Sequence, residues 1–105
     1  DGRTPLSLAA GEGYGATMQL LLERGGTNVN SRDNNDRTPL SFAAEIANEA
    51  TAQLLLEREG VEVNSKDKDG RTPLSWAAGK ANIATIQLLL KREDIEVDSK
   101  DYNGQ

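Results

Sequence analysis

Apolar side chains recur along this chain with helical spacing in two kinds of segment that alternate. In the first kind, illustrated by residues 73–78, Leu74, Ala77 and Ala78 fall at positions i, i+3 and i+4 and form a single apolar stripe. In the second kind, illustrated by residues 83–90, isoleucines and leucines are apolar on more than one side of a helix. The pattern predicts pairs of short helices, the second of which is covered both by its partner and by a neighbouring pair.

A helix start can be assigned in front of each stripe of the first kind. Thr72 can cap a helix with its hydroxyl group, and Pro73 suits the first helical position because its missing N–H group needs no partner there. Two of the three stripe residues are alanine, so a neighbouring element can approach the stripe closely. The same wording, Arg-Thr-Pro-Leu-Ser-x-Ala-Ala, occurs at residues 3–10, 37–44 and 71–78.

The chain is an internal repeat with a strict period. Pro5, Pro39 and Pro73 lie 34 residues apart, and 17 of the 34 aligned positions are identical in all three copies. A period of this size is typical of stacked repeats, in which each unit is too small to bury its own apolar face and packs on its neighbours. We therefore expect one array of three repeats and the start of a further copy. The expected boundaries are residues 1–34, 35–68, 69–102 and 103–105.

Each repeat is expected to contain two helices followed by an extended finger of polar turn formers. In the second repeat we expect the helices at residues 39–47 and 49–58. Asn48 and Asn82 stand at the joints between helices, where an asparagine can adopt a left-handed conformation or can cap the next helix. The fingers are expected at residues 27–35 and 95–100.

Composition narrows the classes of partner and compartment. The formal net charge of −5 at pH 7 makes nucleic acid and anionic lipid poor partners. The absence of cysteine excludes disulfides and thiolate metal sites and suits a reducing compartment, so we expect an intracellular, cytoplasmic protein. We also expect no membrane span and no signal peptide, because the sequence has neither a long apolar run nor a charged-then-apolar leader.

The residue inventory argues against catalysis. General acid–base chemistry near neutral pH relies first on histidine, and the chain has none. Ser7, Ser41 and Ser75 have no base of the kind that activates a nucleophile, and their recurrence at one place in every repeat favours a structural role. We expect no enzymatic activity and no catalytic residue.

Two glycine-containing segments superficially suggest ligand sites. Gly11-x-Gly13-x-Gly15 follows a predicted helix, whereas a dinucleotide-binding glycine turn must follow a strand. The segment 67–70 has the composition of a calcium loop, but Trp76 would then occupy the twelfth position, where a bidentate glutamate is needed. We therefore expect no cofactor and no metal, and we interpret Trp76 as a residue that packs between repeats.

The repeated sequence motif resembles that of a known family. Thr-Pro-Leu-Ser-Trp-Ala-Ala at residues 72–78, the Leu-Leu-Leu helix that follows and Val-Asn-Ser-Lys-Asp at residues 63–67 are similar to the ankyrin repeat, and the resemblance covers the whole chain. The family usually has Gly-His where Gly13-Tyr14 stands and a unit of about 33 residues. It also usually has a histidine where this chain has Ser7, Ser41 and Ser75. The resemblance implies an all-α ankyrin-repeat solenoid of helix-turn-helix units joined by extended, hairpin-like fingers.

The function that the resemblance implies is binding of a partner protein through a concave face formed by the finger tips and the first helices. The implied partner-binding residues are Arg3, Glu12, Asn34, Asn35, Arg37, Glu45, Ile46, Lys68, Asp69, Arg71, Gly79 and Lys80. Ile46 is unusual, since Glu12 and Lys80 occupy the matching positions; it is either a contact residue or a single apolar residue at the surface without a role. The sequence does not identify the partner protein.

Two other interpretations remain open at this stage. The array is either a self-associating structure that stacks end to end, or a sensor or linker segment of a larger receptor or enzyme. Self-association is suggested because terminal repeats usually carry polar residues on their outer side, and these do not. The apolar residues expected near the two ends are Leu8, Met18 and Leu20 in the first repeat and Trp76, Ile86 and Leu88 in the third.

Overall fold

The computed structural model describes residues 2–24, 27–46 and 48–97, and within them it contains six helices and no strand. None of these helices is long and apolar enough to cross a membrane. The expected finger at 95–100 lies partly outside the described residues, and the expected start of a further repeat at 103–105 lies wholly outside them. The helices are α1 (Pro5–Glu12), α2 (Gly15–Glu23), α3 (Pro39–Glu45), α4 (Glu49–Leu56), α5 (Pro73–Gly79) and α6 (Ile83–Leu90).

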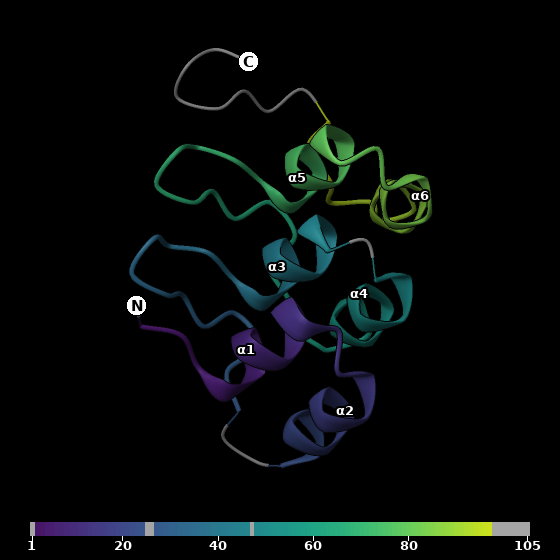
Figure 1. The fold of residues 1–105 in the computed structure, drawn as a ribbon. Coiled ribbons are helices and arrows are strands. Elements are labelled where there is room, and N and C mark those ends of the chain that lie inside the picture. The colour runs from purple at the N-terminus through teal and green to yellow at the C-terminus, as the bar shows by residue number, and fades with distance from the viewer. Residues whose placement is uncertain (1, 25–26, 47, 98–105) are drawn as a thin grey trace.

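The helices form two columns. Figure 1 shows α1, α3 and α5 stacked one above another, with α2, α4 and α6 in a second column beside them. Each helix packs on its partner in the same pair and on the corresponding helix of the adjacent pair. The segments that join one pair to the next extend from the first column, away from the second (Figure 1). This arrangement confirms the predicted all-α solenoid.

Every helix of the first column begins with a reciprocal cap. At the start of α3, the Thr38 hydroxyl accepts a hydrogen bond from the Ser41 backbone N–H (3.4 Å), and Ser41 Oγ accepts one from the Thr38 N–H (3.1 Å). Pro39 occupies the first helical position. The same bonds and the same proline occur at the starts of α1 and α5, so the predicted helix starts are confirmed.

The asparagines at the helix joints act as caps. Asn48 Oδ1 accepts from the Thr51 N–H at 3.0 Å, and Asn82 Oδ1 accepts from the Thr85 N–H at 3.4 Å. The left-handed residue at the α5–α6 joint is Ala81, with φ of 54°, and not the asparagine that follows it. Of the two roles that the sequence left open for these asparagines, the structure therefore selects helix capping.

Two helices end earlier than the sequence predicted. α3 ends at Glu45 rather than at residue 47, and Ala47 itself lies outside the described residues. α4 ends at Leu56 rather than at residue 58 because the Arg58 N–H donates to the Leu55 carbonyl (3.1 Å) in a tightened last turn. The chain then reverses direction at Gly60, which has φ of 82°.

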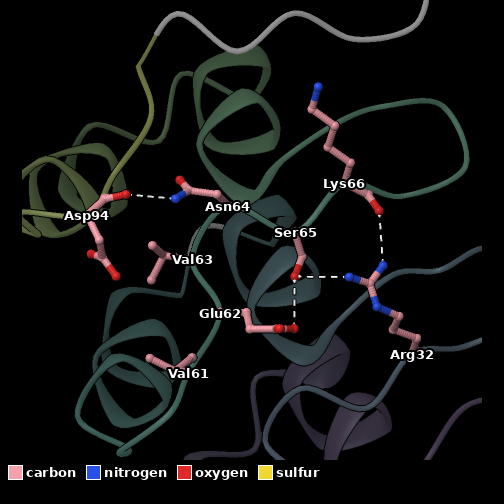
Figure 2. Close-up of a pocket in the computed structure, with 8 residues that line it drawn as sticks. All are labelled: Arg32, Val61, Glu62, Val63, Asn64, Ser65, Lys66 and Asp94. Carbon is pink, nitrogen blue, oxygen red and sulfur yellow. Dashed lines mark hydrogen bonds between the residues drawn. The ribbon is translucent and has the colours of Figure 1, made fainter.

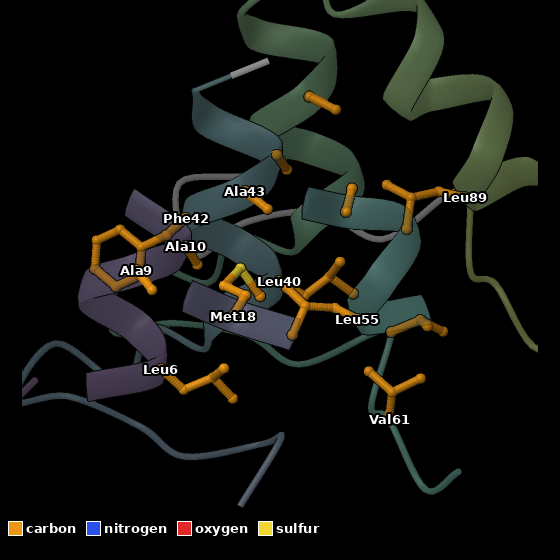
Figure 3. Packing of buried hydrophobic residues seen from close by; sticks show 14 of the residues in the cluster. Leu6, Ala9, Ala10, Met18, Leu40, Phe42, Ala43, Leu55, Val61 and Leu89 are labelled. Atoms are coloured by element: carbon orange, nitrogen blue, oxygen red, sulfur yellow. The ribbon is translucent and has the colours of Figure 1, made fainter. Parts of the chain in front are cut away.

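The core runs along the stack between the two columns. Ala10, Ala43 and Ala44 are fully buried where first-column helices meet, which lets the helix backbones approach closely. Figure 3 shows Met18 and Leu55 of the second column near Leu40 and the first-column alanines, a continuous cluster that crosses the repeat boundaries. Each repeat thus completes its core with residues of its neighbours, as expected for a solenoid.

The ends of the stack expose apolar side chains, but not all of those expected. Leu8 and Leu20 are 47% and 67% exposed. Met18 is 0% exposed, so its expected place at the outer surface is wrong; its side chain points between the helix columns. At the other end Trp76, Ile86 and Leu88 are half-buried, and the exposed apolar residues of α6 are Ile83 and Leu90.

Candidate interaction face

Two buried aspartates hold the turns at the finger tips. Asp33 Oδ1 accepts hydrogen bonds from the backbone N–H groups of Asn35 (2.8 Å) and Arg37 (3.0 Å). Asp67 Oδ1 makes the same two bonds one repeat later, to Asp69 (2.9 Å) and to the arginine that precedes α5 (3.0 Å). An aspartate that bonds to the backbone two and four residues onward fixes a turn locally, so each finger tip leads its arginine to the start of the next helix in the same way.

Neighbouring fingers are joined to each other. The Lys68 N–H donates to the Asn35 carbonyl at 3.0 Å, and Arg32 Nη1 donates to the Lys66 carbonyl at 3.1 Å. Both bonds end on backbone carbonyls of the fingers, so they do not occupy the side chains at the finger tips. The exposed finger-tip residues are Asn34, Asn35, Lys68 and Asp69. The four finger-tip residues named from the sequence therefore lie together at the surface on a hydrogen-bonded support.

Arginine and aromatic side chains alternate along the first column. The guanidinium carbon of Arg37 lies 4.0 Å from the ring centroid of Phe42 and 4.1 Å from that of Trp76, so this group is sandwiched between two repeats. The guanidinium carbon of Arg3 lies 4.5 Å from the same Phe42 centroid, and that of Arg71 lies 5.1 Å from the Trp76 centroid. Cation–π contacts at such distances are attractive, so the series ties the three repeats together at the surface.

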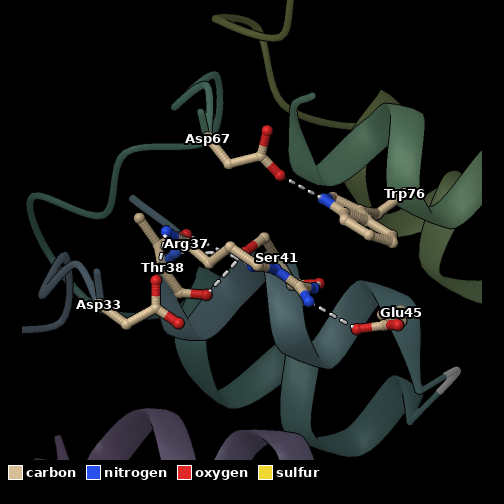
Figure 4. A network of polar contacts seen from close by, with 7 residues as sticks. All are labelled: Asp33, Arg37, Thr38, Ser41, Glu45, Asp67 and Trp76. Carbon is tan, nitrogen blue, oxygen red and sulfur yellow. Dashed lines mark hydrogen bonds and ion pairs between the residues drawn. The ribbon is translucent and has the colours of Figure 1, made fainter. Parts of the chain in front are cut away.

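Arg37 is also neutralised within its own repeat. Its Nη1 lies 2.8 Å from Glu45 Oε1, and its Nη2 donates to the Ser41 carbonyl at 3.2 Å (Figure 4). The Arg37 side chain is only 12% exposed. Trp76 is held in turn by its Nε1–H group, which donates to Asp67 Oδ2 at 3.0 Å (Figure 4). The two terminal nitrogens of Arg37 and the indole N–H of Trp76 therefore have defined partners, whereas the buried Arg37 Nε has none.

The remaining residues named from the sequence lie along the same side. Glu12, Gly79 and Lys80 are exposed at the carboxyl ends of α1 and α5. Ile46 is half-buried rather than exposed, which corrects the expectation from the sequence. It ends α3 beside the α1–α2 joint, where a Cβ atom on Gly13 would lie 3.5 Å from Ile46 Cδ1.

We call this side the finger–helix face. It consists of the finger tips and the exposed edges of α1, α3 and α5. Its residues are Arg3, Glu12, Asn34, Asn35, Arg37, Glu45, Ile46, Lys68, Asp69, Arg71, Gly79 and Lys80, together with the half-buried ring of Trp76. The Phe42 ring, against which Arg3 and Arg37 pack, is buried at 3% exposed.

A separate hollow of about 460 Å³ is polar and internally bonded. Figure 2 shows Arg32 reaching the Lys66 carbonyl and Ser65, whose hydroxyl also bonds to Glu62. At the other side of the hollow Asn64 Nδ2 donates to the Asp94 carbonyl at 2.7 Å (Figure 2). These groups bond to one another, so we interpret the hollow as a structural joint between repeats.

Asn30 and Asn64 form a clamp that the sequence reasoning missed. Asn64 Oδ1 accepts from the Glu96 N–H at 2.9 Å while its Nδ2 reaches the carbonyl two residues earlier, at Asp94. Asn30 does the same to the Glu62 N–H (2.8 Å) and the Gly60 carbonyl (2.8 Å). The sequence feature that could have indicated this clamp is the recurrence of asparagine, 34 residues apart, at positions 30 and 64.

One carboxyl near this joint has a perturbed pKa. Hydrogen bonding to the Arg92 side chain lowers the pKa of the exposed Asp94 below its usual value. Among residues 2–24, 27–46 and 48–97 there is no cluster of three or more histidine, cysteine, aspartate or glutamate residues that could hold a metal ion.

The arginine–aromatic series was also missed, although its signal is visible in the sequence. In the second and third repeats an arginine stands five residues before an aromatic residue, as Arg37 before Phe42 and Arg71 before Trp76. This spacing identifies the residues of the series, but it does not predict the contact between repeats, in which Arg37 also stacks on Trp76 of the following repeat.

Comparisons with known proteins agree with this geometry. A family model described as ankyrin repeats matches residues 6–101 in three copies. A search of the curated proteins finds no match.

Proposed function

Because this chain belongs to the ankyrin repeat family, whose members are generally protein–protein interaction modules and typically not enzymes, we propose that it binds a partner protein through the finger–helix face. The observation that carries the proposal is the composition of that face. It combines exposed polar finger tips with two exposed arginines, Arg3 and Arg71, and the half-buried ring of Trp76, over which Arg71 lies. Arginine and aromatic side chains are the groups that most often dominate the binding energy of protein interfaces.

The rigidity of the face supports the proposal. The finger tips are hydrogen-bonded to one another through Lys68 and Asn35, and Asp33 and Asp67 fix the turns from beneath. A face that is already ordered loses little conformational entropy when a partner binds. The second column offers no comparable grouping among the described residues, since α2, α4 and α6 contribute no aromatic side chain.

The proposal can be tested by selecting ligands and then locating their site. Peptides selected from a random display library against the purified chain are measured against two double variants by isothermal titration calorimetry. Lys68→Glu with Arg71→Glu alters the face. Arg58→Glu with Lys91→Glu makes the same change in charge at exposed residues near the ends of α4 and α6.

We expect most selected peptides to lose at least about tenfold in affinity for the first variant and little for the second, because interface charges act locally once salt screens them. Peptides that depend on Arg58 and Lys91 instead would contradict the assignment of the face. Failure of the library to yield any specific ligand would contradict the binding function.

We propose end-to-end self-association as a second function, on the strength of the apolar residues at the two ends. Leu8 and Leu20 are exposed at one end and Leu90 at the other. Ala78 is exposed where the corresponding Ala44 is fully buried by the next repeat. A second copy that continues the stack would cover these side chains as α5 covers α3, although the entropy of association offsets much of the gain.

Sedimentation equilibrium over a concentration series tests the second proposal. The average mass should rise with concentration in the wild type, and Leu20→Lys with Leu90→Lys should remove the rise. A wild-type protein that stays monomeric at millimolar concentration would contradict it.

A further inference from the structure

The three repeats treat their shared arginine differently. Arg37 has a carboxylate from its own repeat, Glu45, which lies near the end of α3. The residues 34 positions before and after Glu45 are Gly11 and Gly79. The first and third repeats therefore keep the arginine but carry no side chain at the place from which Glu45 reaches it.

The Arg37–Glu45 ion pair of the second repeat shows which chemical group fits beside the shared arginine. Glu45 Oε1 lies 2.8 Å from Arg37 Nη1 (Figure 4), and the guanidinium carbon lies 4.0 Å from the ring centroid of Phe42 and 4.1 Å from that of Trp76. A bond of this length between charged groups is a strong, charge-assisted hydrogen bond. The geometry is thus an internal example of a carboxylate bound to an arginine that an aromatic ring supports.

The third repeat has the same arginine and ring without the carboxylate. Arg71 is exposed and lies 5.1 Å from the centroid of Trp76, whose orientation is fixed by the bond from its Nε1 to Asp67. Within residues 2–24, 27–46 and 48–97 no carboxylate is ion-paired with Arg71. A Cβ atom added at Gly79 would meet no atom within 4 Å, so the space corresponding to Glu45 is open.

We propose that the open space beside Arg71 and Gly79 binds a carboxylate side chain from an acidic segment of the partner protein, in the position that Glu45 occupies beside Arg37. This inference rests on the proposed function and names the chemistry of one contact. Lys80, the exposed C-cap residue of α5, follows Gly79 directly in the chain. The Trp76 ring, 5.1 Å from the Arg71 guanidinium carbon, supports the arginine from one side through a cation–π contact.

An acidic protein segment fits better than a polyanion such as nucleic acid. The chain carries a net charge of −5, which repels an extended run of phosphates. A single glutamate or aspartate needs only the local positive charge of Arg71, and Glu45 shows that a carboxylate has the right size for such a place.

The test supplies the missing carboxylate from the protein itself. Gly79→Glu places a glutamate where Glu45 stands in the second repeat, and Gly79→Gln adds a side chain of the same size without charge. Gln87→Glu adds the same charge at an exposed position of α6 and controls for general repulsion. The probes are a short peptide of alternating glutamate and glycine and a matched peptide in which glutamine replaces glutamate.

Trp76 provides the readout, because it is the only tryptophan and its indole N–H gives a single NMR signal. We expect the glutamate peptide to shift this signal saturably in the wild type and the glutamine peptide to leave it unchanged. Gly79→Glu should bind the glutamate peptide roughly fivefold more weakly than Gly79→Gln, because its own carboxylate occupies Arg71. Gln87→Glu should bind more tightly than Gly79→Glu.

Three results would overturn the inference. They are equal affinity of the two Gly79 variants for the glutamate peptide, equal response to both peptides, and a stronger response to single-stranded DNA than to the glutamate peptide. If selected ligands depend on the finger–helix face while the glutamate peptide does not bind, the carboxylate site is wrong and the proposed function stands. Ligands that do not depend on the face contradict the proposed function itself.

Discussion

Replacing Ser41 by alanine should destabilise the array through a single buried backbone group. Ser41 Oγ accepts the Thr38 N–H at 3.1 Å and donates to the Thr38 carbonyl at 2.8 Å. Ser41 and Thr38 are 3% and 2% exposed. In Ser41→Ala the Thr38 N–H keeps its buried position and loses its acceptor.

The size of the effect follows from two opposing contributions. An unpaired buried N–H group costs about 1 to 3 kcal/mol. Alanine has a higher helix propensity than serine and returns about 0.5 kcal/mol. We therefore expect the free energy of unfolding to fall by about 0.5 to 2.5 kcal/mol, and each kcal/mol lowers Tm by about 4 to 8 °C for a domain near this size.

Ser75→Ala is the matched control. Ser75 makes the same two bonds to Thr72, each of 2.8 Å, but it is half-buried. Thr72 is as buried as Thr38, at 3% exposed, but the partly exposed position of Ser75 lets a water molecule take the place of the lost hydroxyl and accept the Thr72 N–H, so the loss of stability should be smaller. Urea unfolding followed by circular dichroism measures both variants. Equal losses, or no loss in Ser41→Ala, would refute the argument that access of water to the place of the lost hydroxyl sets the cost.

Two further substitutions test the joints of the stack. Asn64→Ala removes the bonds to Asp94 and Glu96, so it should cost about 1 to 2 kcal/mol in urea unfolding and speed hydrogen exchange at the Glu96 amide; unchanged exchange would contradict the clamp. Ala81→Gly should raise the free energy of unfolding by about 0.5 to 1 kcal/mol, because alanine at φ of 54° is strained and Gly13 adopts the same region without strain; a lower Tm would contradict this.

The helix starts and the repeat could be predicted because their causes are local. Thr38, Pro39 and Ser41 lie within four residues of one another, and the capping hydrogen bonds form in each repeat that carries this motif. The role of the asparagine at each helix joint was harder to predict, since the sequence allowed it either to cap the next helix or to adopt a left-handed conformation. The neighbouring Ala81 takes the left-handed conformation and leaves Asn82 to cap α6.

The sequence by itself also named most residues of the finger–helix face, but through resemblance to a family and not through contacts. It could not distinguish Arg37, which Glu45 neutralises, from Arg71, which stands beside Gly79 with its guanidinium exposed. It also placed Met18 at an outer surface although the side chain is fully buried.

These outcomes depend on how one repeat is set upon the next. Arg37 reaches the ring of Trp76, and Asn64 reaches the backbone of Asp94, across a boundary between repeats. Side-chain periodicity defines which face of a helix is apolar, yet it carries no information on the rotation and rise between stacked pairs. That geometry comes from the close packing of the alanines in the first column, so only the tertiary structure decides which arginine is enclosed and which is open to a partner.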